Sequence, residues 1–388
     1  MTNDQNDWGL PLNQYANLNN DKLNPPFDSD LDLDCYIESI RLGIQQIHIY
    51  NHSSCRDTPQ VSISTLRSLS RAYLHPVTLR HMASPSLVSG CIKLASMVKP
   101  NGQSSLFSYE YGYLSFTILV ISISACLLQR WASLNKTFTM VHLSSRDILE
   151  ELAQEVSGLI RQRLTSGNCL DGERIDQILG WNNNSNALQH PPLISNSEAS
   201  AMVTLLWLDR KAFLYALSVT RMPSVVGLML PLWRHCYIEH STRSAEGQNL
   251  ALEFHEILWR YNCGTNWLRV EEWVVNLFDI GMEGGLQTMK KVEQRHTADL
   301  EDSRRIILAF INQVYPIQIT LDRNKLAGAS QASILFRFVY SFVQPGTQDL
   351  FPSLFEAIIE CFWRDLQFRL TGEEELILSL LTVVSNFK

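Results

Sequence analysis

The chain has 388 residues, of which 45% are hydrophobic and 18% are charged, and its formal net charge is −7. This balance is typical of a folded globular protein and excludes an intrinsically disordered chain. It also argues against nucleic acid as a partner, because the densest basic sites, Lys290-Lys291 and Arg304-Arg305, do not extend into a stripe that neutralises several phosphates. The length allows one large domain or a few ordinary ones.

The cysteines and the N-terminus predict the compartment. The eight cysteines are far apart and none forms a Cys-x-x-Cys pair, which is typical of free thiols in a reducing environment. The first residues are polar and acidic and lack the apolar region of a secretory signal. The sequons at Asn51, Asn135 and Asn183 are then interpreted as chance matches. We therefore expect a cytoplasmic protein.

Residues 1–34 are rich in Asn, Asp and Pro and show no apolar period, which predicts a disordered or loosely attached arm. Within this arm, Asp28 to Asp34 places carboxylates at alternate positions, like the start of an EF-hand loop. Leu33 stands where that loop needs glycine, and Ser39 stands where it needs a glutamate. The pattern therefore does not predict calcium binding.

From Asp34 onward, apolar residues recur with the period of an α-helix. The first apolar face is marked by isoleucines at steps of three and four residues, namely Ile37, Ile40, Ile44 and Ile47. Ser84-Pro85 opens a further helix, a long apolar helix follows over about 107–132, and an amphipathic helix covers 144–164. Together these segments predict an N-terminal helical region over 35–181.

Residues 182–197 combine Asn, Pro and Ser around a single Leu-Ile pair, which is typical of a loop or linker. This segment is the expected boundary before a C-terminal helical region, 198–388. Helices are predicted there over 198–221, 224–241 with a kink at Pro231, 245–262, 266–280, 284–296, 299–315, 329–343, 350–369 and 373–386. The nearest strand-like run, Ile317 to Leu321, is too short to build a sheet.

The segment from Tyr111 to Leu128 has no charged side chain and is just long enough to cross a membrane. On a helix its polar residues form two lines on nearly opposite sides, Ser115, Ser122 and Gln129 on one and Thr117 and Ser124 on the other. Two apolar faces lie between these lines, which predicts a core helix held by neighbours on both sides. The residues expected to be buried against protein are Val120, Ile121, Ile123 and Leu127. A single-span membrane anchor over 111–128 is the alternative.

Part of this segment is also similar in sequence to other proteins. FSYEYGYLSF and LVISISACLLQR, which lie within residues 107–130, resemble a segment of uncharacterised helical proteins of basidiomycete fungi. The resemblance covers about residues 75–135. It implies a fungal intracellular protein, and it brings no activity and no catalytic or binding residues with it.

The best metal candidate is Trp233 to His240. Cys236 and His240 share a helical face there, as do His235 and Glu239, and His255 could join them from the next helix. The spacing is neither His-Glu-x-x-His nor a closed four-ligand pattern. We therefore predict no metal ligands in this chain.

Catalytic motifs are also not found. Gly281 to Gly285 joins two expected helices and is interpreted as a hinge or helix cap rather than a phosphate loop. Asp299 to Arg305 lacks the clustered aspartates with which all-helical prenyl-diphosphate enzymes hold magnesium. We predict no catalytic residue and no cofactor. An all-helical enzyme whose site is assembled only in three dimensions is the alternative.

These patterns predict an all-α protein of about 12–15 helices, arranged as an irregular armadillo-like or HEAT-like α-solenoid or as a multi-helical array. Fold-level analogy then indicates a scaffold that binds an unknown protein partner through a grooved face. The membrane-associated protein and the all-helical enzyme remain the alternatives to this hypothesis.

Overall fold

A computed structural model of the chain describes residues 8–20, 33–52, 61–72, 76–97, 105–131, 148–165, 172–181, 190–220, 222–264, 299–315 and 329–368. The described residues form fifteen α-helices and two short 3-10 helices, and their one β contact is an isolated bridge between Pro11 and Tyr109. The prediction of an all-α fold is confirmed. The chain divides into two compact units, unit 1 over 1–254 and unit 2 over 255–388.

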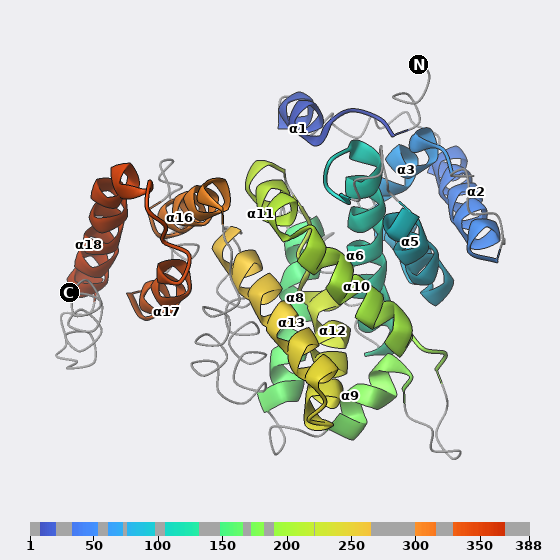
Figure 1. Cartoon of the computed structure of the whole chain (residues 1–388). Helices are drawn as coiled ribbons and strands as arrows, with labels where there is room; N and C mark the ends of the chain where they lie inside the picture. The colour runs from blue at the N-terminus through green and yellow to red at the C-terminus, as the bar shows by residue number, and fades with distance from the viewer. Residues whose placement is uncertain are drawn as a thin grey trace. The chain divides into compact units, whose positions relative to one another are not determined.

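The helices keep the labels of Figure 1. Unit 1 contains α1 (Leu12–Asn20), α2 (Leu33–His52), α3 (Ile63–Ser70), α4 (Pro76–Leu79), η2 (Arg80–Met82), α5 (Pro85–Met97), α6 (Glu110–Arg130), α8 (Ile148–Thr165), α9 (Gly172–Leu179), α10 (Asn196–Leu208), α11 (Arg210–Val219) and α12 (Val226–Ser241). The division between the units falls within α13 (Ala245–Gly264). Unit 2 contains α16 (Leu300–Val314), α17 (Ala329–Tyr340), η5 (Gln348–Leu350) and α18 (Phe351–Phe368). The expected helices at 266–280, 284–296 and 373–386, and the run Ile317 to Leu321, lie outside the described residues.

The core of unit 1 is built around α6, which packs against α3, α5, α8 and α12 (Figure 1). Every residue from Glu110 to Leu128 is buried. The four side chains predicted to be buried, Val120, Ile121, Ile123 and Leu127, each have an exposed fraction of 0%. Among the described helices, α6 is the one that is long and apolar enough to cross a membrane, but its apolar stretch is wholly enclosed by the protein. The prediction of a core helix is therefore confirmed.

The small polar residues of α6 allow close packing. The Ser115 hydroxyl donates to the carbonyl oxygen of Tyr111 at 2.9 Å, so this polar group is satisfied within the helix. Ser124 faces Gly227 of α12, where an added Cβ would lie 2.7 Å from the Ser124 hydroxyl oxygen. A side chain at position 227 would therefore push α12 away from α6.

Residues 8–20 belong to the arm expected to be disordered or loosely attached, and in the structure they are folded as part of unit 1. The Leu12 amide donates to the Ser108 carbonyl oxygen at 3.0 Å, and the Glu110 amide donates to the Leu10 carbonyl oxygen at 2.8 Å. Leu12 and Ala16 of α1 are buried. Composition could not predict this contact, because it depends on only two buried apolar side chains and a few backbone hydrogen bonds within a polar stretch.

The Glu110 carboxylate fixes this N-terminal strap. It is buried, it accepts two hydrogen bonds from the Arg67 guanidinium at 2.6 and 2.7 Å, and it accepts the Leu10 amide at 3.2 Å. Gly9 makes the close approach possible because its φ is +72° and an added Cβ would lie 2.6 Å from a Glu110 carboxylate oxygen. The strap is thus held by a charged pair and a glycine rather than by a large apolar contact.

The expected linker over 182–197 lies inside unit 1, and its described part, 190–197, is folded. The Leu193 amide donates to the Leu179 carbonyl oxygen at 2.9 Å, and the Trp181 indole donates to the Ile194 carbonyl oxygen at 2.6 Å. Leu193 and Ile194 are both buried. The division between the two compact units falls within the predicted helix 245–262, where a continuous helical period gives no sign of a boundary.

The single helix predicted over 198–221 is divided at Asp209 into α10 and α11. The Asp209 carboxylate accepts hydrogen bonds from the Ser105 hydroxyl and the Phe107 amide, each at 3.1 Å. Burial raises the pKa of Asp209, although these hydrogen bonds lower it in part. The corner between α10 and α11 is therefore tied to the turn that precedes α6, a contact that the helical period could not reveal.

Candidate functional site

The metal candidate from the sequence lies on α12 and does not assemble a metal site. The Cys236 thiol is buried and donates to the Leu250 carbonyl oxygen at 3.8 Å. Burial lowers the pKa of His235, which is also enclosed. Within the ranges that the structure describes, no three His, Cys, Asp or Glu side chains lie close enough to hold a metal ion. The remaining members of the candidate are Glu239 and His240, which are half-buried, and His255, which is buried in unit 2.

The other sequence motifs lie either outside the described residues or at the beginning of α16. Gly281 to Gly285 lies outside the described residues, as does Asp28 to Asp32 of the EF-hand-like run. Asp299 to Arg305 forms the beginning of α16, where Asp299 is the N-cap. One member of this last motif, Asp302, belongs to a charge cluster that the sequence did not reveal.

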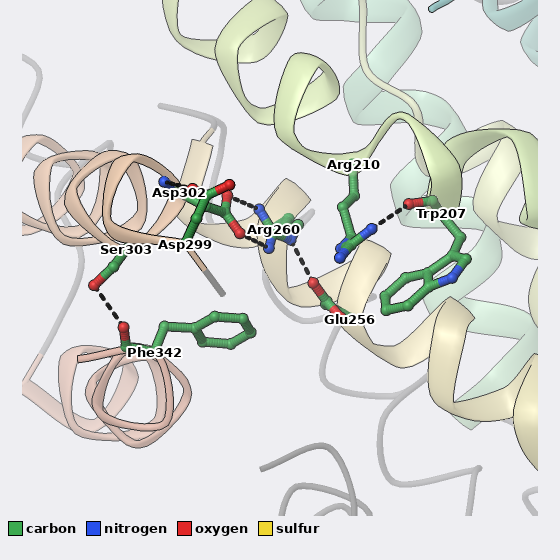
Figure 2. A network of polar contacts seen from close by, with 8 residues as sticks. All are labelled: Trp207, Arg210, Glu256, Arg260, Asp299, Asp302, Ser303 and Phe342. Carbon is green, nitrogen blue, oxygen red and sulfur yellow. Dashed lines mark hydrogen bonds and ion pairs between the residues drawn. The ribbon is translucent and has the colours of Figure 1, made fainter. Parts of the chain in front are cut away.

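This charge cluster joins α13 and α16 within unit 2 (Figure 2). The Arg260 guanidinium donates to Glu256 at 2.7 Å and to the two carboxylate oxygens of Asp302 at 2.8 and 2.7 Å. The exposed fraction is 0% for the Arg260 side chain and 1% for each of the two acids. We call Glu256, Arg260 and Asp302 the Arg260 cluster.

Helix geometry places each member of the cluster. Glu256 and Arg260 are four residues apart on α13 and are therefore neighbours on one face. Asp302 lies in the first turn of α16, where the Asp299 carboxylate accepts the Asp302 amide at 2.9 Å. The positive end of the helix dipole at this turn favours an acidic side chain. Only the meeting of Arg260 with Asp302 requires tertiary structure.

The balance of charges keeps Arg260 protonated. Burial by itself would lower the pKa of Arg260, but the hydrogen bonds to Asp302 and the charges of Glu256 and Asp302 outweigh burial and raise it. The cluster therefore holds two carboxylates against one guanidinium. Removing one partner of a buried ion pair typically costs about 3–5 kcal/mol, because a charge is left without compensation. Since all three side chains are sealed from solvent, the cluster fixes the positions of α13 and α16 relative to each other within unit 2.

One aromatic ring contacts the cluster directly, and a stacked pair of rings lies on α13 and α17. The Arg260 guanidinium lies 5.4 Å from the centroid of the Phe342 ring, and the Ser303 hydroxyl donates to the Phe342 carbonyl oxygen at 2.5 Å (Figure 2). The Trp259 and Phe338 rings stack at 6.2 Å between centroids. These contacts connect the cluster to α17 and to the residues that follow it. The Arg260 cluster therefore supports the side of unit 2 on which α16, α17 and α18 pack.

The exposed side of α18 has a different character. Ile359 is 64% exposed and Trp363 is 57% exposed, and because they are four residues apart they lie one turn apart on one face. Glu356 and Glu360 are exposed beside them. The opposite side of α18 packs in unit 2 with α16 and α17 through Leu354, Ala357, Ile358, Cys361 and Phe362. We call Glu356, Ile359, Glu360 and Trp363 the α18 outer face.

Comparison with known proteins gives no match, because no family model fits the chain and neither a curated protein nor a solved structure is significantly similar to it. The resemblance to helical proteins of basidiomycete fungi stays a prediction. Among the features described above, the α18 outer face is the one that combines exposed large apolar side chains with adjacent charges.

Proposed function

We propose that this chain is a protein-interaction protein that binds its partner through the α18 outer face. The supporting observation is the pair of Trp363 and Ile359, which are more than half exposed and adjacent on one helix. An isolated exposed apolar side chain is ordinary. A tryptophan next to a second large apolar residue is a typical centre of a binding surface, because burying it on a partner releases much apolar area from water.

The flanking charges indicate the chemistry of the partner. Glu356 and Glu360 lie beside the apolar pair, and no basic residue stands between these two glutamates in the sequence. A complementary surface would offer apolar side chains at helical spacing with Lys or Arg next to them. The partner proposed is therefore an amphipathic helix with a basic edge, which binds with its apolar side toward Trp363.

The finer fold within this proposal is a compact multi-helical array. In a solenoid each repeat contacts its neighbours in sequence. In unit 1, by contrast, α6 contacts both α3 and α12, which are far apart in the chain. A single helix face is sufficient for the proposed binding, so the grooved surface of an α-solenoid is not required.

The alternatives receive less support. Because α6 is buried over its whole apolar length, residues 111–128 have no face left for lipid, so a membrane anchor is not proposed. The enzyme alternative is not supported by a metal site, because the described residues contain no group of three His, Cys, Asp or Glu side chains that could hold a metal ion. The cytoplasmic location, the fungal origin and the identity of the protein partner stay predictions.

The test is a binding measurement on the full chain. Partners are identified by affinity purification and mass spectrometry, and the dissociation constant is then measured with each purified partner. Trp363→Ala should weaken binding by about 30-fold, which corresponds to the roughly 2 kcal/mol of a hot-spot residue. Leu42→Ala on α2 is the matched control, because Leu42 is also exposed, at 51%. An unchanged dissociation constant for every partner of the Trp363→Ala variant would contradict the proposal.

A further inference from the structure

The first turns of α16 hold the connection between α17 and α18 at two places. The Ser303 hydroxyl donates to the Phe342 carbonyl oxygen at 2.5 Å, just after the end of α17 (Figure 2). Arg304 donates to the Gly346 carbonyl oxygen at 3.3 Å and to the two carboxylate oxygens of Asp349 at 2.6 and 2.7 Å. Asp349 lies in η5, two residues before α18 begins. The Arg304–Asp349 ion pair therefore connects α16 with the beginning of α18.

The connection itself has a defined backbone. Gly346 has a φ of +101°, and an added Cβ there would lie 3.0 Å from the Leu300 side chain. Thr347 is buried, and its amide and its hydroxyl both donate to the Gln344 carbonyl oxygen. The Leu350 amide then donates to the Thr347 carbonyl oxygen at 3.0 Å. The turn is therefore fixed by its own hydrogen bonds up to the residue before α18.

The contacts that hold α18 in unit 2 differ in how far they specify direction. Within unit 2, α18 packs against α16 and α17 through Leu354, Ala357, Ile358, Cys361 and Phe362. The burial of apolar surface is non-directional. A guanidinium that binds both oxygens of one carboxylate has a single favoured geometry. The Arg304–Asp349 pair therefore adds a directional contact to the apolar packing of α18.

We propose that Arg304 is a positioning residue for the α18 outer face. Its ion pair with Asp349 fixes the place and the rotation with which α18 begins. Because a helix has a constant 3.6 residues per turn, a rotation of its first turn moves every residue of its outer face by the same angle. The pair thereby determines where Ile359 and Trp363 point. Its effect on partner binding rests on the proposed function, whereas its effect on α18 does not.

The exposure of the pair separates positioning from stability. The side chain of Asp349 is 59% exposed, and exposed ion pairs contribute little to global stability. The hydrogen bonds from Arg304 lower the pKa of Asp349, so the pair stays charged at neutral pH. Loss of the pair should therefore leave the free energy of unfolding nearly unchanged, while α18 occupies a wider range of positions.

The next residue provides a matched control. Arg305 forms an ion pair with Glu301, which lies within α16. The exposed fractions of the two arginine side chains are similar, 36% for Arg304 and 39% for Arg305. The two ion pairs differ in that one joins two elements and the other lies in a single helix. Arg305→Met should therefore leave α18 in place, although it also removes an exposed ion pair.

Spin labels in the full chain report the position of α18 without a partner. The labels are attached to cysteines introduced at position 312 of α16 and position 359 of α18, which are both exposed. Before labelling, serine replaces the native cysteines outside the buried set, namely Cys35, Cys55 and Cys169. Dipolar spectroscopy then gives the distribution of distances between the two labels.

The distance distribution distinguishes the two arginines. Arg304→Met should broaden or shift the distribution, and Arg305→Met should leave it as in the parent chain. Asp349→Asn should have the same effect as Arg304→Met. The double variant should show no larger change than either single variant, because both remove one interaction. An unchanged distribution in Arg304→Met, an equal change in Arg305→Met, or additive changes in the double variant would overturn the inference.

The consequence for binding is measured with a partner identified for the proposed function. Arg304→Met should weaken the dissociation constant by about two- to fivefold, the size of effect expected from an exposed ion pair. Arg305→Met should leave the dissociation constant unchanged, and urea unfolding should show similar stability for both variants. Equal partner binding by Arg304→Met and the parent chain, despite an altered distance distribution, would overturn the positioning role.

The inference and the proposed function fail in distinguishable ways. If Arg304→Met alters the distances but Trp363→Ala does not weaken partner binding, the ion pair positions α18 and the proposed function fails alone. If Trp363→Ala weakens partner binding but Arg304→Met leaves the distances unchanged, the inference fails alone.

Discussion

The contact surfaces of α6 in unit 1 and of α13 in unit 2 are stabilised by opposite means. From Tyr111 to Leu128, α6 is buried among apolar neighbours without a charged side chain. The buried part of α13 instead holds Arg260 between two carboxylates. Burial of apolar surface is non-directional, whereas an ion pair has one partner and one geometry. Residues 111–128 of α6 are therefore held by close apolar packing, and the buried part of α13 is held in addition by a specific ion pair.

The two units also differ in how many large hydrophobic side chains they expose. Of the large hydrophobic side chains exposed on the described residues, six belong to unit 2, Leu300, Leu308, Tyr315, Tyr340, Ile359 and Trp363. Three belong to unit 1, Leu42, Ile49 and Leu208, although more of its residues are described. Unit 2 thus leaves apolar surface free that unit 1 encloses, which is why the proposed binding surface lies in unit 2.

Removing the charge of Arg260 should have the largest effect on stability. Arg260→Met leaves Glu256 and Asp302 buried without a cation, so the free energy of unfolding should fall by about 3–5 kcal/mol. Urea unfolding measures the loss, and hydrogen exchange of α13 and α16 localises it. The control is Arg304→Met, which breaks the exposed pair of Arg304 and Asp349 and should change stability little. Equal effects of the two variants would contradict the contrast between buried and exposed pairs.

Adding volume between α6 and α12 should have the next largest effect. Gly227→Val places side-chain atoms where the Ser124 hydroxyl already lies, so unfolding should become easier by about 1–3 kcal/mol, as for overpacked cores. Gly158→Ala on α8 is the control, because an added Cβ there meets no atom within 4 Å. This control should stabilise the helix by about 1 kcal/mol. A neutral Gly227→Val would show that α12 can move away from α6 at little cost.

The N-terminal strap can be released without touching either core. Gly9→Val combines a φ of +72° with a clash against the Glu110 carboxylate, so residues 8–12 should detach from α6. Hydrogen exchange should then be faster at the Leu12 and Tyr111 amides, which donate across this contact. Gln14→Val, on the exposed side of α1, should leave both amides protected. Unchanged exchange in Gly9→Val would mean that the strap is not held by this glycine.

The smallest expected effect is a pH dependence in unit 1. Burial lowers the pKa of His235 below the 6.5 of an unperturbed histidine, so the unfolded chain binds the proton more readily than the folded one. Stability should therefore be fully present above that value and decrease as the pH falls below it. In His235→Gln, the difference in unfolding free energy between about pH 7.5 and about pH 5.5 should be smaller. His48→Asn, on the exposed side of α2, should keep the difference of the parent chain.

The sequence predicts unit 1 best where apolar and polar residues recur regularly along one helix. The two serine and threonine lines of α6 correctly indicate burial on both sides, because a helix with two apolar faces has to be covered twice. The helices α12, α16 and α18 lie close to their predicted ranges for the same reason. Periodicity within one helix carries this information without tertiary contacts.

The parts that the sequence could not predict are contacts between distant residues. The pairing of Arg260 with Asp302 spans 42 residues, and Asp209 divides a predicted helix through contacts with residues before α6. The α18 outer face could be predicted only in part. A helix that packs against one core needs a single apolar stripe, and α18 has more apolar residues than that stripe requires. Only the structure shows that Ile359 and Trp363 are the exposed ones.

The central claim is that the α18 outer face is the binding surface of this protein. A photo-cross-linking amino acid at position 359 of the full chain tests it most directly, with the same residue at position 42 as the control. We predict that position 359 captures one identified protein and that position 42 does not capture it. Capture of the same proteins from both positions would contradict the account.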